Sequence, residues 1–276
     1  MGKRIASTTG LWLFVFAALW FFRTKGAVVL ITLMSGLTLR EFYQLQTAAG
    51  RSPFSGMGMA FGAWITAAPW FEAHYTWSSA HVLPIAILIL SLRILAEREG
   101  NQRVDALGST IFGLVYVGLM LGYLVRLVTP LPGDPISADA RLILCLWLVA
   151  TAKFCDTGAL LSGLAFGKHP MAPTVSPKKT WEGAVGGVAI SAGVSALVAW
   201  LARGELGDFL SPGRAAIIAV PVAIVAIVSD LIESMLKRQA DSKDSGKAIP
   251  GIGGIFDLTD SLLLAAPVGF MFLGFR

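Results

Sequence analysis

Residues 214–236 read RAAIIAVPVAIVAIVSDLIESML, an almost unbroken apolar run, and residues 237–254 continue as KRQADSKDSGKAIPGIGG, rich in charge and glycine. A second apolar run follows at 253–275. Each run is long enough to cross about 30 Å of hydrocarbon as a helix. Burying a charge in a bilayer costs at least about 2.5–3.5 kcal/mol on insertion scales, so acids at the mouth of such helices need a reason. The stretch therefore predicts two membrane helices joined by a functional polar loop.

The whole chain has the composition of an integral membrane protein. Of its 276 residues, 55% are hydrophobic and 14% are charged, with a mean hydropathy of +0.70. Backbone polar groups in lipid must be satisfied internally, so we expect an all-α, polytopic membrane helix bundle. Cys145 and Cys155 share one apolar stretch, which indicates neither a disulfide framework nor a zinc site.

Nine apolar runs predict about nine transmembrane helices. The start resembles a signal peptide, but Arg23 and Lys25 follow without a small-residue cleavage pattern, so an uncleaved first span is expected. We expect N-terminal helices over 1–140 and a catalytic region over 141–276, together one integral membrane unit. The runs lie at about 6–22, 26–39, 53–71, 82–96, 105–125, 142–166, 181–202, 214–236 and 253–275.

The distribution of lysine and arginine predicts the orientation in the membrane. One set of loops and the N-terminus carry 14 of the 22 cations and the opposite side carries 7, leaving Lys153 inside a span. The positive-inside rule then places the loops 167–180 and 237–250 in the cytoplasm and Pro132 on the other side. The net charge of +5 reflects this bias and anionic lipid, so no nucleic-acid partner is expected.

Carboxylates near the cytoplasmic ends of the last two spans suit a hard divalent cation. Asp230 and Glu233 share one face of the eighth helix, and Asp257 and Asp260 share one face of the ninth. Mg²⁺ prefers oxygen ligands, usually one or two carboxylates with waters and substrate phosphates. With Asp244 from the loop, these acids predict a Mg²⁺ site; ordinary helix-end charges that suit the helix dipole are the structural alternative.

Cations and glycines beside these acids suit a polyanion. Backbone N–H groups at Gly253 and Gly254 precede a helix and can approach an anion. A second cytoplasmic segment, Ser176–Gly183, brings further lysines to the start of the seventh span, where they also fit simple membrane anchors. The candidate phosphate-binding cations are Lys178, Lys179, Lys237, Arg238, Lys243 and Lys247.

Taken together, these motifs resemble the phosphatidate cytidylyltransferase (CDP-diacylglycerol synthase) family. The resemblance rests on Ser234-x-x-Lys237-Arg238-x4-Lys243-Asp244-Ser245-Gly246, on Pro250-Gly251-x-Gly253-Gly254-x-x-Asp257-x-x-Asp260, and on Ser176–Gly183. It covers roughly the C-terminal half. Two positions depart from the family pattern: Ile252 stands where His is common, and Leu258 where Arg is common.

The resemblance implies transfer of a cytidylyl group from CTP to phosphatidate, giving CDP-diacylglycerol and pyrophosphate for phospholipid synthesis. It implies an enzyme of the cell (inner) membrane with its site on the cytoplasmic side, and a homodimer. Asp230, Asp257, Lys243 and Asp244 are the expected catalytic residues, and Asp230, Asp257, Asp244 and Asp260 the expected Mg²⁺ ligands. Substrate binding is expected at Ser176, Lys178, Lys179, Ser234, Lys237, Arg238, Lys247, Gly253 and Gly254.

Two other functions stay open from the residues alone. Another CTP-using lipid transferase, such as a polyprenol kinase, needs the same cations and metal. An ion-coupled transporter is the more distant alternative, because Lys153, Asp156 and Asp230 lie within apolar spans. Lys153 and Asp156 also suit a simple ion pair. If Lys153 is occupied by Asp156, Lys247 is the favoured cation to make the substrate contact of the missing His or Arg.

Overall fold

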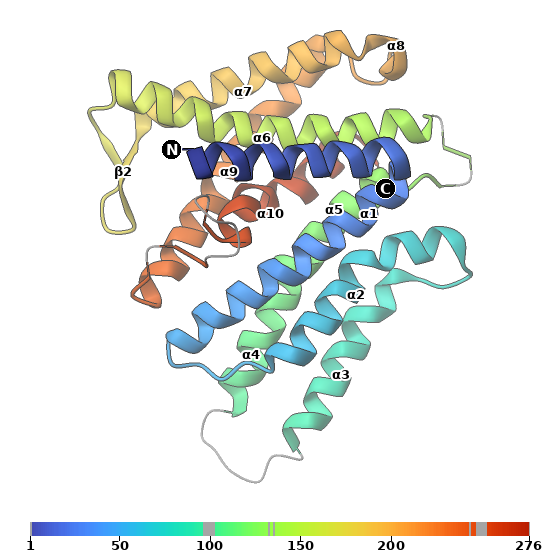
Figure 1. Cartoon of the computed structure of the whole chain (residues 1–276), viewed down its shortest axis with the longest axis vertical. Coiled ribbons are helices and arrows are strands. Elements are labelled where there is room, and N and C mark those ends of the chain that lie inside the picture. Colours follow the sequence, from blue (N-terminus) through green and yellow to red (C-terminus); the bar gives the residue numbers. More distant parts are fainter. Residues whose placement is uncertain are drawn as a thin grey trace. The chain divides into compact units, whose positions relative to one another are not determined.

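The computed structural model describes residues 2–95, 103–131, 133–134, 136–242, 244–246 and 253–275, with side chains from residue 15 onward. Over these residues the chain is mostly helical, with one short hairpin (Figure 1). The elements are α1 (Gly2–Ala48), α2 (Ser55–His74), η1 (Ser79–His81), α3 (Val82–Leu95), α4 (Arg103–Gly113), η2 (Leu114–Leu119), α5 (Met120–Val128), α6 (Ala138–Phe166), β1 (Pro170–Ala172), β2 (Ser176–Thr180), α7 (Trp181–Leu201), α8 (Arg203–Leu206), α9 (Pro212–Gln239) and α10 (Ile255–Phe272).

Six stretches in the described part of the chain are long and apolar enough to cross a membrane. The protein is therefore a helical membrane protein, as predicted, whereas the count of about nine spans is not confirmed. The predicted spans 6–22 and 26–39 both fall in α1, which has a non-helical backbone at Arg23 (φ 46°, ψ −128°). The predicted span 82–96 corresponds to α3, which has only 14 residues.

The residues group into two compact units. Unit 1 comprises Met1–Thr129 with Leu236–Thr259, and unit 2 comprises Pro130–Met235 with Asp260–Arg276. The C-terminal end of α9 and the start of α10 thus belong to unit 1. The predicted division at residue 140 stays a prediction.

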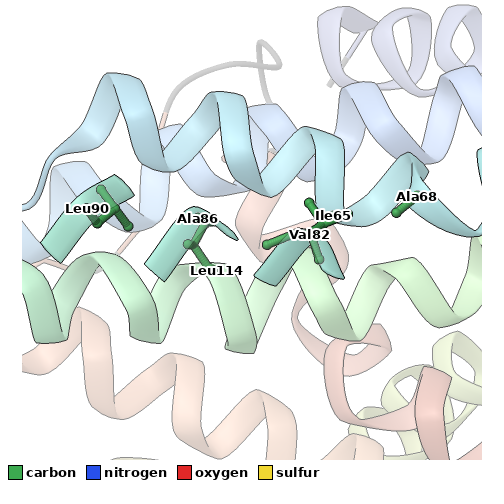
Figure 2. Close-up of a cluster of buried hydrophobic side chains, with 6 residues drawn as sticks. All are labelled: Ile65, Ala68, Val82, Ala86, Leu90 and Leu114. Atoms are coloured by element: carbon green, nitrogen blue, oxygen red, sulfur yellow. The ribbon is translucent and has the colours of Figure 1, made fainter. Parts of the chain in front are cut away.

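The core of unit 1 packs α2 and α3 against the segment that joins α4 to α5. Six buried side chains form this cluster (Figure 2). Close approach of the helices is possible because Gly62 faces Gly118, where an added Cβ would lie 3.1 Å from backbone atoms. Thr66 donates its hydroxyl to the Gly118 carbonyl at 2.9 Å, which satisfies a backbone group of the π-helical segment η2. The cluster consists of Ile65, Ala68, Val82, Ala86, Leu90 and Leu114.

In unit 2, α6 and α7 lie side by side over most of their lengths (Figure 1). Glycines let the two backbones approach: a Cβ on Gly187 would lie 2.7 Å from the Cys155 carbonyl oxygen. Small residues at such contacts are typical of membrane helix pairs. The buried Thr151 and Ser195 hydroxyls form a hydrogen bond of 2.8 Å between the helices. These contacts hold α6 in register with α7.

A β-hairpin leads into α7 and carries two of the candidate lysines. Its strands are antiparallel, pairing Pro170 with Thr180 and Ala172 with Ser176. The Ser176–Gly183 segment is thus strand up to Thr180, whose side chain caps α7 by accepting the Gly183 N–H at 3.1 Å. This small sheet departs from the all-α prediction, and it fixes the direction of the polar segment before the membrane helix begins.

Candidate functional site

Three carboxylates in unit 2 come together at α9 and α10. Asp230 and Glu233 lie one turn apart on α9, and Asp260 lies on α10. One oxygen of each lies within 4.8 Å of the others. Glu233 is fully buried and Asp260 is 8% exposed. Carboxylates buried this close together repel one another unless a cation or a proton joins them.

Two lysines flank the three carboxylates. The Lys179 ammonium on β2 makes a close ion pair with Asp230. On α6, the Lys153 Nζ lies 3.1 Å from Asp260 Oδ1 and 3.4 Å from Asp156 Oδ2. The predicted Lys153–Asp156 pair is therefore present, but Lys153 also binds a predicted metal ligand. With Asp156, the cluster holds four carboxylates and two ammonium groups, which leaves two negative charges if all are ionised.

The donor set of this cluster fits a divalent metal ion. Two oxygens that bind one Mg²⁺ at about 2.1 Å lie at most about 4.2 Å apart, so small side-chain rotations let the three acids share an ion. An all-oxygen set suits Mg²⁺, Ca²⁺ or Mn²⁺ rather than Zn²⁺. Asp230, Glu233 and Asp260 are thus the residues of unit 2 best placed to hold it.

A cavity of about 320 Å³ opens beside this acidic cluster. Its charged lining comes from Asp156, Lys178, Lys179 and Asp230. The rest of the wall is largely apolar and includes Leu160, Leu164 and Ile227. One space therefore offers ammonium groups, carboxylates and a hydrocarbon surface.

In unit 1, the start of α10 forms a second polar cluster around Asp257. The Asp257 Oδ1 atom lies 2.9 Å from Lys237 Nζ. Its Oδ2 accepts the Gly254 N–H at 2.9 Å and the Ser245 hydroxyl at 3.0 Å. Gly253 has φ +125°, a conformation that glycine adopts without strain. The carboxylate thereby caps its own helix, as the structural alternative for these acids anticipated.

Several predicted site residues have a place in these clusters, and others do not. Asp244 and Arg238 are exposed, and Ser176 and Ser234 are half-buried. Asp230 and Asp257 belong to different units, so their predicted convergence on one cation stays a prediction. The predicted residues Lys243 and Lys247, the departure Ile252 and the topology marker Pro132 lie outside the described residues.

Two acids in these clusters are not among the predicted site residues. Glu233 shares a helix face with Asp230, and this spacing is the signal that could have marked it as a metal ligand. Glu41 follows a predicted span that ends at residue 39, yet it lies within α1 and is 5% exposed. Its contacts are with residues more than 200 positions away, which no local pattern reveals.

Comparison with known proteins identifies the family of the chain. A sequence model of the Cytidylyltransferase family matches residues 2–275. The chain belongs to the cytidylyltransferase family. This confirms the family predicted from the C-terminal motifs, and it extends the match to the N-terminal helices.

Relatives within the cytidylyltransferase family share between a quarter and two fifths of their residues with the chain. It is 29% identical to a phosphatidate cytidylyltransferase of Synechocystis sp., over 92% of this chain and 88% of that protein. It is 33% identical to the chloroplastic phosphatidate cytidylyltransferase 5 of Arabidopsis thaliana, over 68% of this chain and 50% of that protein. It is 39% identical to the phosphatidate cytidylyltransferase of Haemophilus influenzae, over 46% of this chain and 44% of that protein. The chain thus spans most of the cyanobacterial relative and about half of the plant one.

Proposed function

We propose that the protein transfers the cytidylyl group of CTP to phosphatidate, giving CDP-diacylglycerol and pyrophosphate. It is a membrane-bound nucleotidyltransferase of the cytidylyltransferase family. The observation that carries the proposed reaction is the cavity that Lys178, Lys179 and Asp230 line beside an apolar wall. Such a space suits a substrate with an anionic head group and acyl chains, and the relatives' names point to the same lipid.

The chemistry asks the protein mainly to position and neutralise phosphates. A phosphate oxygen of phosphatidate attacks the α-phosphorus of CTP, the bond to the β-phosphate bridge breaks, and pyrophosphate leaves with the electron pair. The attacking phosphate is already ionised at neutral pH, so no general base is assigned. Lys178 and Lys179 neutralise negative charge on the substrates and hold them in line.

The acids prepare the site for a metal. Asp230, Glu233 and Asp260 would hold Mg²⁺, which supplies charge stabilisation on the triphosphate when bound. Lys153 keeps the Asp260 carboxylate oriented through its contact of 3.1 Å. Asp257 and Lys237, which pair at 2.9 Å, are proposed to bind phosphate or metal in the same reaction. Their roles, like those of Asp244 and Arg238, rest on the motif.

Two labels on CTP test the reaction and separate it from the nearest alternative. Purified protein in lipid nanodiscs is incubated with Mg²⁺, phosphatidate or a polyprenol, and CTP labelled at either the α- or the γ-phosphorus. Cytidylyl transfer carries only the α-label into the lipid fraction. A polyprenol kinase carries only the γ-label, and no lipid label from either nucleotide would also refute the proposal.

The cytoplasmic side of the cell membrane is the proposed location of the site. Positive charge on the hairpin before α7 supports this orientation. Cysteines introduced at Lys178 and at Asp208, which lie beyond opposite ends of α7, test it by membrane-impermeant labelling of inverted and right-side-out vesicles. Cys145 and Cys155 are buried and should give little background. Labelling of the position-178 cysteine from the outside would contradict the orientation.

A homodimer, which the family resemblance implies, stays a prediction.

A further inference from the structure

Glu41 is a buried carboxylate to which the proposed mechanism gives no task. It lies on α1 in unit 1 and is 5% exposed. Its Oε2 accepts the Phe256 backbone N–H at 2.9 Å and lies 3.1 Å from the Ser245 hydroxyl. A buried carboxylate is expensive unless hydrogen bonds satisfy it. Both bonds connect α1 to the glycine-rich segment and to the start of α10.

The segment around Glu41 is built to admit the carboxylate. A Cβ on Gly246 would lie 2.4 Å from Glu41 Oε1, and a Cβ on Gly254 would lie 2.3 Å from Oε2. A larger residue at either position would have to displace the Glu41 carboxylate. The two glycines therefore leave open the space that this carboxylate occupies.

Glu41 and Ser245 cap α10 from outside that helix. The first N–H groups of a helix have no partner within it. Glu41 accepts the backbone N–H of Phe256, and the Ser245 hydroxyl oxygen accepts the backbone N–H of Asp257 at 3.3 Å. The same hydroxyl lies 3.0 Å from Asp257 Oδ2, so its single proton is shared between two carboxylates. Glu41, Ser245, Asp257 and Lys237 thus form one continuous chain of contacts from the interior outward.

We propose that Glu41 is a positioning residue for the transfer site. It caps α10 and, through Ser245, fixes the orientation of the Asp257 carboxylate and of the Lys237 ammonium paired with it. Its effect on catalysis rests on the proposed function, because Asp257 and Lys237 are assigned there to phosphate or metal. Its effect on the order of the α10 start does not depend on that function.

The test compares Glu41→Leu, which keeps the volume but removes the acceptor, with Glu41→Gln, which keeps an acceptor oxygen. Thr38→Val is the matched control: Thr38 lies one turn earlier on α1 and bonds the Thr259 hydroxyl at 3.0 Å, so its loss weakens the same pair of helices. Hydrogen exchange of the peptide spanning 253–260 is measured together with KM for CTP and the half-saturating Mg²⁺ concentration. Exchange reports local opening whether or not the protein turns over CTP.

Glu41→Leu should speed exchange at the start of α10 and raise the half-saturating Mg²⁺ concentration or the KM for CTP by about tenfold or more, the usual effect of losing a charge-assisted contact. Glu41→Gln should recover most of both, and Thr38→Val should leave the Mg²⁺ and CTP dependence unchanged. Wild-type exchange in Glu41→Leu, or an equal kinetic shift in Thr38→Val, would overturn the inference.

Ser245→Ala keeps the inference testable if Glu41→Leu does not fold. It removes the bridging hydroxyl from the other end, so it should give the same kinetic shift and the same faster exchange at the start of α10. Wild-type exchange and kinetics in Ser245→Ala would overturn the inference. If wild-type protein made no CDP-diacylglycerol, the proposed function would fail, and exchange alone would still decide whether Glu41 orders α10.

Discussion

Replacing Asp260 with asparagine tests the metal cluster most directly. The substitution keeps the shape of the side chain and removes one of the three clustered carboxylates. It also takes away one of the two acids that bind Lys153, leaving Asp156 at 3.4 Å. We expect turnover to fall by two orders of magnitude or more and the half-saturating Mg²⁺ concentration to rise, since hard cations depend on charged oxygen ligands.

The effect of Asp260→Asn on stability should depend on the metal. Losing one partner of a fully buried ion pair costs about 3–5 kcal/mol. The Lys153 side chain is 33% exposed and keeps Asp156, so about 1–2 kcal/mol is a better figure. Relief of repulsion between the clustered carboxylates offsets part of this in the absence of Mg²⁺. At a Mg²⁺ concentration 100 times the dissociation constant, the wild type gains about 2.7 kcal/mol. A variant with 100-fold weaker binding gains only about 0.4 kcal/mol.

Thermal unfolding with and without Mg²⁺, together with the rate as a function of Mg²⁺ concentration, measures both effects. Asp134→Asn is the matched control, because it breaks a 2.7 Å pair with Arg141, whose side chain is 2% exposed. Arg141 lies about 18 Å along α6 from Lys153. The control should lose more stability than Asp260→Asn but keep its Mg²⁺ dependence. If Asp260→Asn kept the wild-type Mg²⁺ dependence in both assays, the acids would not form a metal site.

Three further substitutions probe the phosphate cluster, the helix pair and the start of α10. Lys179→Gln should raise KM for CTP or phosphatidate about tenfold to a hundredfold, because it loses a charge-assisted contact. Lys168 is exposed, and Lys168→Gln should leave KM unchanged. Equal kinetics in the two variants would remove Lys179 from the site. Gly187→Ala should destabilise the protein by about 1–3 kcal/mol in a denaturation assay, because the added methyl meets the α6 backbone. Gly193 lies on the same helix with open space around it, so Gly193→Ala should be neutral or stabilising. Asp257→Asn should remove most activity, and near-normal turnover at saturating Mg²⁺ would contradict its assignment to phosphate or metal.

The C-terminal helices could be predicted closely from the sequence. The predicted spans 142–166 and 181–202 correspond to α6 at Ala138–Phe166 and α7 at Trp181–Leu201. Long apolar runs bounded by polar turns leave few alternatives for a chain that must satisfy its backbone in lipid. The same physics singles out Asp230 and Asp260 as candidate ligands, because charges inside such runs are costly.

The helix ends of the N-terminal half are harder to predict from the sequence, because a helix need not end where its apolar run ends. The span predicted at 26–39 stops before Arg40, yet α1 continues to Ala48. Glu41 looked like a loop residue for this reason. Its burial depends on Ser245 and Phe256, which the folded chain brings to it from the far end of the sequence. Contacts at such separation leave no periodic trace in a single sequence.

The hydrogen bond between the Gly254 N–H and Asp257 has a consequence for ligand binding. This amide points at an anion already, and the anion is the protein's own carboxylate at 2.9 Å. A phosphate arriving at this turn would have to displace an internal competitor before gaining the bond. Exchange of one charge-assisted hydrogen bond for another releases little net free energy. Affinity at this turn must then come from cations such as the Lys237 ammonium, which already lies 2.9 Å from Asp257. The turn itself would contribute selectivity for ligands that can outcompete a tethered carboxylate.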